Sequence, residues 1–160
     1  MILAIAASVV VAPVPKEAEF GQWVVACDNG LRCEAAGLPD DGEQNGWVVL
    51  VSREAAGTAA PTGVFVPAYG DDPPAEFVLR MDGRPMAVRG THFAKALRSL
   101  AAARKVEVVD GKGAVIGTVP VTGASAALRY MDGRQKRAGT VTAVIEGGSR
   151  PASNAPRPPA

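Results

Sequence analysis

The stretch Phe20-Gly-Gln-Trp23-Val-Val-Ala-Cys27-Asp-Asn-Gly-Leu-Arg-Cys33 contains both cysteines of this 160-residue chain. Its first part, Phe20 to Ala26, alternates in the way that is typical of a β-strand. Asn29-Gly30 favours a tight turn, because both residue types tolerate a positive φ. Arg32 to Ala36 is then predicted to return antiparallel. The stretch therefore predicts a hairpin near the start of the folded domain, with one cysteine on each side of its turn.

Three roles are open to the cysteine pair: a disulfide, a metal site and a redox site. Zinc would require two further Cys, His or carboxylate ligands at suitable spacing, and His92 is the only histidine. A redox pair is expected at two-residue spacing near a helix N-terminus, which five intervening residues do not match. We therefore interpret Cys27 and Cys33 as a structural disulfide, worth about 2 kcal/mol for so short a loop. No metal and no cofactor is predicted.

Residues 1–12 are almost entirely apolar. The run is too short to span a bilayer as a helix, which takes about 20 apolar residues. It resembles the apolar core of a secretory signal peptide without the usual basic start, and a buried first strand is the alternative. A disulfide fits an oxidising compartment. We therefore expect residues 1–19 to be a leader, the protein to be periplasmic, and the chain to have no stable membrane span.

Further strands are predicted outward from this hairpin. Trp47 to Arg53 is a near-continuous apolar run, typical of a strand buried on both faces. Thr62 to Pro67 is predicted as a short edge strand ended by its proline. Asp82-Gly83, between apolar runs, is the strongest short signal for a hairpin. The arms of that hairpin are expected at 76–81 and 84–88, and the remaining strands at 106–109, 114–119 and 140–145.

Two segments have helical periodicity. Apolar residues from Phe93 to Ala101 recur at helical spacing, and Thr91 is the predicted N-cap. A second apolar stripe runs from Ala124 to Met131, with Arg129, Asp132 and Arg134 expected to point outward. The predicted fold is α+β: an antiparallel, sandwich-like sheet of about six to eight strands, with two short helices packed on one face or end. It occupies residues 20–146, and residues 147–160 are expected to be a proline-rich disordered tail or linker.

The chain offers little catalytic chemistry. A net charge of +1 gives no field to attract nucleic acid, so no nucleic-acid partner is predicted. His92 lacks a nucleophile motif beside it. The candidate carboxylates all lie in Gly/Pro loops: Asp40, Asp41, Glu43, Asp71 and Asp72. We expect a non-enzymatic binding module. The alternatives are a hydrolase that uses loop carboxylates and His92, and a small-molecule binding domain with a pocket between sheet and helices.

Two regions are candidate contact surfaces for a partner. The first is the predicted turn, with Asp28, Asn29 and Arg32. The second is the basic end of the second predicted helix, whose members are Arg129, Arg134, Lys136 and Arg137. Cations also complement a helix dipole at this position, which is the alternative interpretation of the second region. The expected partner is an envelope protein or an anionic envelope polymer, and the chain itself is expected to be a monomer.

Two segments together resemble a known family: the motif Phe20-x-x-Trp23-Val-Val-Ala-Cys27-Asp28-Asn29 with Cys33, and the later block Gly123-Ala-Ser-Ala-Ala-Leu-Arg-Tyr-Met-Asp132 with Gln135 and Arg137. The family is one of exported Gram-negative proteins, domain of unknown function 1176, and the resemblance runs from Phe20 to about Pro156. The opening is also similar to the invasion-associated locus B family. The resemblance implies periplasmic residence and an envelope-associated role, without an established activity, cofactor or substrate. It also implies that many members carry a second half after a proline-rich joint.

Overall fold

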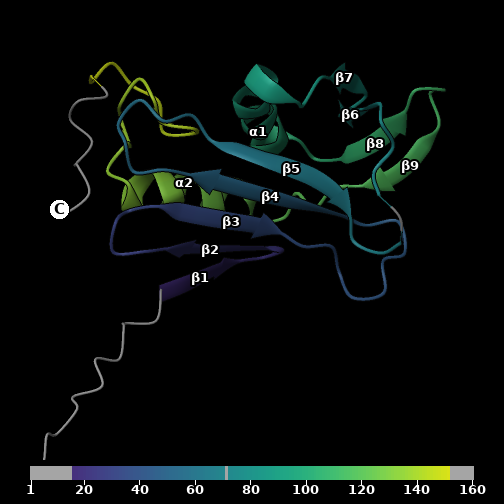
Figure 1. Cartoon of the computed structure of the whole chain (residues 1–160), viewed down its shortest axis with the longest axis horizontal. Helices are drawn as coiled ribbons and strands as arrows, with labels where there is room; N and C mark the ends of the chain where they lie inside the picture. Colours follow the sequence, from purple (N-terminus) through teal and green to yellow (C-terminus); the bar gives the residue numbers. More distant parts are fainter. Residues whose placement is uncertain (1–15, 71, 152–160) are drawn as a thin grey trace, which may run out of the picture.

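A computed structural model describes residues 16–70 and 72–151 of the chain (Figure 1). The described residues form nine β-strands, two α-helices and one turn of 3₁₀ helix. In chain order these are β1 (Lys16–Phe20), β2 (Trp23–Cys27), β3 (Cys33–Gly37), β4 (Trp47–Arg53), β5 (Thr62–Pro67), β6 (Phe77–Met81), β7 (Arg84–Met86), η1 (Gly90–His92), α1 (Phe93–Ala102), β8 (Val106–Asp110), β9 (Val115–Thr118) and α2 (Ala124–Arg134).

The first five strands form one antiparallel sheet in the order β1-β2-β3-β4-β5. The predicted continuous strand from Phe20 to Ala26 is wrong, because the chain reverses between β1 and β2. Gly21 takes a φ of 57°, and Phe20 pairs directly with Trp23. A Cβ at position 21 would lie 2.8 Å from the carbonyl oxygen of Thr122, so glycine allows this close approach. The expected leader overlaps β1 at residues 16–19, and its first fifteen residues lie outside the described part of the chain.

The second sheet has the order β7-β6-β8-β9 and is also antiparallel. Its β6–β7 hairpin is confirmed, with positive φ at both Asp82 and Gly83 as a two-residue turn of this kind requires. The predicted cap at Thr91 is wrong. Thr91 lies inside η1, and α1 follows with His92 at its N-cap and no side-chain capping bond.

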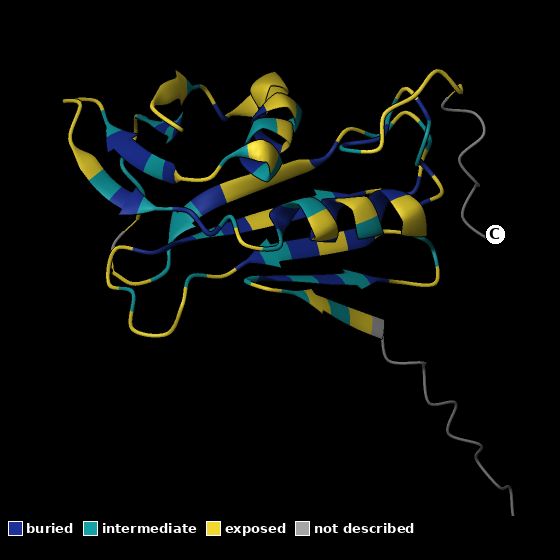
Figure 2. Ribbon diagram, turned by 180° about the vertical axis from the view of Figure 1, so that it is seen from behind, coloured by how far each residue is buried: buried dark blue, intermediate teal, exposed yellow. Residues whose placement is uncertain are grey.

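Both helices lie on one side of the five-stranded sheet. α2 packs against β1, β2 and β3, and α1 contacts α2 and β5. The strands lie in front of α2 in Figure 1 and behind it in Figure 2. The core between them is built from Trp23, Val25, Val49, Phe65, Phe93, Leu97, Leu100, Leu128 and Met131. Two antiparallel sheets with two packed helices confirm the α+β prediction.

β4 is covered on one face only. Its residues alternate from Trp47 onward between buried and more exposed positions, and Leu50 keeps 44% of its surface. The prediction that both faces are buried is therefore wrong. Two of the three outward side chains of this strand, Val48 and Leu50, are apolar even though neither helix covers them, and the third is Ser52.

The segment after α2 does not form the predicted strand at 140–145. It runs in turns, with one isolated bridge from Thr140 to Arg150. The backbone N–H groups of Val144, Ile145 and Glu146 donate to the carboxylate of Asp132 instead of to a neighbouring strand. Residues 147–151 belong to this folded segment, and the rest of the expected tail lies outside the described residues.

Candidate functional site

The predicted disulfide is formed in the structure. Cys27 and Cys33 are register partners at the ends of β2 and β3, and both are buried. The turn that they close is held by Asp28, whose carbonyl oxygen accepts from the N–H of Leu31 at 3.1 Å. The side chain of Asp28 accepts from the N–H of Arg32 at 2.9 Å. The positive φ of this turn, 64°, falls on Leu31 and not on Asn29 or Gly30 as expected.

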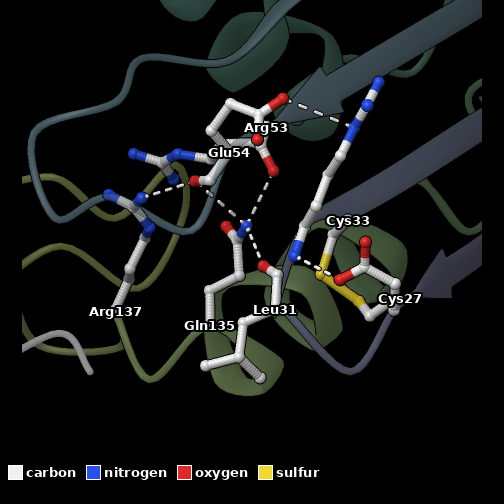
Figure 3. Close-up of a disulfide and its surroundings, with 9 residues drawn as sticks. Cys27, Leu31, Cys33, Arg53, Glu54, Gln135 and Arg137 are labelled. Atoms are coloured by element: carbon white, nitrogen blue, oxygen red, sulfur yellow. Dashed lines mark hydrogen bonds and ion pairs between the residues drawn. A yellow bond between two sulfur atoms is a disulfide. The ribbon is translucent and has the colours of Figure 1, made fainter. Parts of the chain in front are cut away.

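We call residues 28–32, which the disulfide closes into a turn, the stapled turn. Gln135 connects this turn to the end of α2. The Gln135 side-chain amide donates to the carbonyl oxygen of Leu31 at 2.8 Å and to that of Arg53 at 2.9 Å. Figure 3 shows this amide pointing toward both backbone segments, with Arg137 beside it. One side chain therefore joins the β2–β3 turn, the end of β4 and the end of α2.

Gln135 belongs to a buried polar cluster, which we define as Arg53, Asp132, Gln135, Arg137 and Thr140. All five residues are at most 2% exposed. Burial lowers the pKa of Arg53 to about 10, with Arg137 acting in the same direction and Asp132 against it. Burial also lowers the pKa of Arg137. The cluster therefore holds two cations and one carboxylate away from solvent.

Asp132 and Arg137 were both expected on the surface, and the structure corrects both expectations. Asp132 accepts from three backbone N–H groups at 2.8, 2.8 and 3.1 Å, and from Arg53 Nη1 at 3.4 Å. Arg137 donates to the carbonyl oxygens of Glu54, Ala56 and Gly57 in the loop after β4. These side chains hold two irregular segments against the domain, because their charged groups satisfy backbone atoms that no strand pairs.

The predicted basic surface at the end of α2 is smaller than expected. Arg137 is buried, and Arg129 is paired with Glu146 at 3.1 Å. Arg134 and Lys136 remain exposed. At the stapled turn, Asp28 and Asn29 are exposed, and Arg32 pairs with Glu34 at 2.9 Å and Glu54 at 3.4 Å.

The candidate catalytic groups are not gathered in the described part of the chain. His92 is exposed at the start of α1, and no hydrogen bond or ion pair joins it to a described carboxylate. No group of three or more His, Cys, Asp or Glu side chains among the described residues is placed to hold a metal ion. Asp71 lies outside the described residues. Neither described helix is long and apolar enough to cross a membrane.

Sequence reasoning missed an exposed apolar surface on the five-stranded sheet. Val24, Ala36, Leu50 and Val64 are successive register partners across β2 to β5 and form one row. Val48 and Val66 pair in the adjacent row. Leu50 and Val64 are 44% and 50% exposed. We call these six residues the open face. In the sequence, the continuous apolar run of β4 was the feature that indicated the open face.

An acidic hollow of about 630 Å³ continues from the open face at one end. Val24 belongs to both surfaces, and Leu38, which is 46% exposed, also lines the hollow. Three carboxylates line it, those of Glu19, Asp40 and Asp41, and none of its described lining residues is basic. This end of the sheet therefore combines apolar side chains with uncompensated negative charge.

Comparisons with known proteins place these features in a family context. The family described as "Protein of unknown function (DUF1176)" matches residues 17–160. The chain is similar to the curated "Uncharacterized protein YpfG" of Escherichia coli (strain K12), with 29% identity over 167 residues. That alignment covers 91% of this chain and 46% of the relative, so the chain spans about half the relative's length. No solved structure matches the chain.

Proposed function

This chain belongs to the DUF1176 family of proteins of unknown function, and we propose that it is an exported, non-enzymatic module that binds a protein partner through its open face. Family membership confirms the main resemblance found in the sequence. The similarity of the opening to the invasion-associated locus B family stays a prediction. The family description names no activity, so the proposal rests on the surface chemistry of the chain itself.

The open face is the observation that carries this proposal. An antiparallel sheet with one face in water normally alternates between apolar inward and polar outward residues. Here the outward row is Val24, Ala36, Leu50 and Val64, and the adjacent pair is Val48 and Val66. Contiguous exposed apolar surface of this kind marks interaction sites in soluble proteins. A protein partner would bury these side chains and gain the hydrophobic free energy that the isolated domain leaves unused.

Charge complementarity defines the partner's chemistry. The hollow beside the open face presents Glu19, Asp40 and Asp41 without a basic lining residue. A complementary surface therefore carries apolar side chains followed by Lys or Arg. This favours a basic protein segment over the anionic polymer considered from the sequence, because Arg137 is buried and Arg129 is already paired.

Export is supported by two independent features. The disulfide joins the two strands of the β2–β3 hairpin beside its turn, and structural disulfides persist in oxidising compartments. The apolar run at residues 1–12 has the composition of a signal-peptide core. We propose periplasmic residence on these grounds.

Photocrosslinking in cells tests the proposal. A photoreactive amino acid is placed at Ala36, within the open face, and in a matched strain at Ala126, on the exposed side of α2. We expect a discrete crosslinked protein from position 36 and not from position 126. Equal labelling at both positions, or none at position 36, overturns the proposal.

The crosslinked protein, once purified, is then titrated with the full chain. Leu50→Glu is expected to weaken its binding by more than about tenfold, because it places a charge in the centre of an apolar contact. Val115→Glu is the matched control, since Val115 is equally exposed at 48% but lies on β9 in the other sheet. Glu19→Gln with Asp41→Asn is expected to weaken binding and to reduce its dependence on salt. An affinity insensitive to Leu50→Glu contradicts the proposed surface.

A further inference from the structure

A second hollow lies on the helix side of the molecule, away from the open face. It has a volume of about 140 Å³ and is formed by the loop after β4, one side of α1 and residues 141–144. Its polar lining residues are Arg53, Thr58, Arg98 and Thr142, and none of its described lining residues is acidic. A liquid water molecule occupies about 30 Å³, so the hollow fits a group of a few heavy atoms and not a polymer strand.

Arg53 forms the buried wall of this hollow and has unused donors. Its guanidinium carries five N–H groups. Nε donates to the carbonyl oxygen of Ala59 at 2.9 Å, Nη1 to Asp132 at 3.4 Å, and Nη2 to the carbonyl oxygen of Thr142. Two N–H groups, one on each terminal nitrogen, therefore have no partner among the described residues. Because Arg53 is only 2% exposed, bulk water is a poor substitute for that partner.

The charged side chains around the hollow include more cations than carboxylates. Asp132 is the only carboxylate within the buried polar cluster, and it faces both Arg53 and Arg137. Its oxygens already accept from three backbone N–H groups. Arg98 adds a further cation at the mouth and forms no ion pair with a described carboxylate. Burial is the main cause of the lowered pKa of Arg53, Arg137 and Arg98 lower it further, and Asp132 acts in the opposite direction.

We propose that this hollow binds a phosphate group, with Arg53 at its base and Arg98 at its mouth. Guanidinium groups match the paired oxygens of phosphate, which form strong charge-assisted hydrogen bonds with them. Thr58 lines the same space, and its hydroxyl group can supply a neutral donor. The phosphate comes either from a small free phosphate or from the headgroup of an anionic phospholipid, and both present the same oxygens.

Calorimetric titration of the full chain with inorganic phosphate tests the site at constant ionic strength, with chloride as the competing anion. Arg98→Gln is the main variant, because Arg98 is exposed and its loss spares the buried cluster. We expect this variant to weaken phosphate binding by about tenfold or more. Arg84→Gln, an exposed arginine on β7 outside the hollow, is the matched control and is expected to bind as the parent chain does. Thr58→Ala is expected to weaken binding less.

Vesicles distinguish the two sources of phosphate. The full chain is sedimented with phosphatidylglycerol vesicles and with phosphatidylcholine vesicles of the same size. Arg98-dependent sedimentation with the anionic vesicles alone assigns the site to a headgroup. Phosphate binding without sedimentation assigns it to a free phosphate. Binding to neither probe, or binding that Arg98→Gln leaves unchanged, overturns the proposal. Leu50→Glu is expected to leave phosphate binding intact, so this test is independent of the protein-binding proposal.

Discussion

Asp132→Asn tests whether the buried polar cluster holds the irregular end of the chain in place. The substitution keeps the size of the side chain but removes its charge. Asp132 is fully buried, and one of its oxygens accepts from the N–H groups of Ile145 and Glu146. In the variant, the amide NH₂ would face either those two donors or, if the amide flips, the N–H of Val144 and Arg53 Nη1. Arg53 and Arg137 would also remain as two buried cations without a carboxylate between them.

The expected loss is about 3–5 kcal/mol in the free energy of unfolding, the range found when one partner of a buried ion pair is removed. No reduction for solvent screening applies, because the side chains of Arg53 and Asp132 are 2% and 0% exposed. Whole domains of this size are stable by about 5–15 kcal/mol, so the variant would lose a large part of the total. Exposed loop positions behave differently, and Asp41→Asn should change stability by less than about 0.5 kcal/mol.

Urea unfolding at neutral pH, followed by circular dichroism, measures this loss. With a slope of about 2 kcal/mol per molar urea, the midpoint should fall by about 1.5–2.5 M for Asp132→Asn. For Asp41→Asn it should move by less than about 0.25 M. A midpoint within about 0.5 M of the parent chain for Asp132→Asn, with an unchanged slope, would refute the structural role assigned to this carboxylate.

Three further predictions concern other parts of the molecule. Replacing Cys27 and Cys33 together by alanine should lower the free energy of unfolding by about 2 kcal/mol relative to the oxidised chain, and free thiols in periplasmic material would contradict the disulfide. Hydrogen bonds from Lys105 and Arg80 lower the pKa of Glu107 below its ordinary value of 4.5. The stability that Glu107 contributes is therefore present above that value and is lost as the pH falls through the folded-state pKa. Urea midpoints of the parent chain and Glu107→Gln should converge as the pH falls below the ordinary value of 4.5, and a difference that stays constant with pH would contradict this linkage. His92→Ala should leave stability and partner binding unchanged, and loss of a cellular phenotype with a folded protein would favour the hydrolase alternative.

Local signals predicted the β2–β3, β6–β7 and β8–β9 hairpins, but not the reversal between β1 and β2. Asp82-Gly83 specifies its own turn, because both residues can adopt a positive φ without help from distant parts of the chain. Trp23 and Val25 alternate with the more exposed Val24 and Ala26, so the face that Trp23 and Val25 share follows from the period of a strand. The disulfide followed from the spacing and from the lack of other metal ligands.

The polar cluster could not be predicted in this way. Asp132, Gln135 and Arg137 lie at the end of an amphipathic helix, where charged residues are normally solvated. The burial of Gln135 and Arg137 depends on the end of β4 and the loop after it, about eighty positions earlier in the sequence, which supply the carbonyl groups that they bind. The sequence patterns of α2 and of the loop after β4 give no indication that these two segments are in contact. The apolar run of β4 did indicate that both faces of this strand are apolar. It could not indicate whether the second face is buried or exposed, because both cases give the same sequence pattern.

The place of α2 in the chain has a consequence for the order of folding. This helix covers β1, β2 and β3, yet it is synthesised about ninety residues after the β2–β3 hairpin. Such a distant contact closes slowly, because a long loop must be ordered before the contact forms. Until then, the sulfur atoms of Cys27 and Cys33 lie on an uncovered surface and remain accessible to oxidants. The disulfide can therefore form before α2 packs against the sheet. Packing of α2 then buries the disulfide in the core.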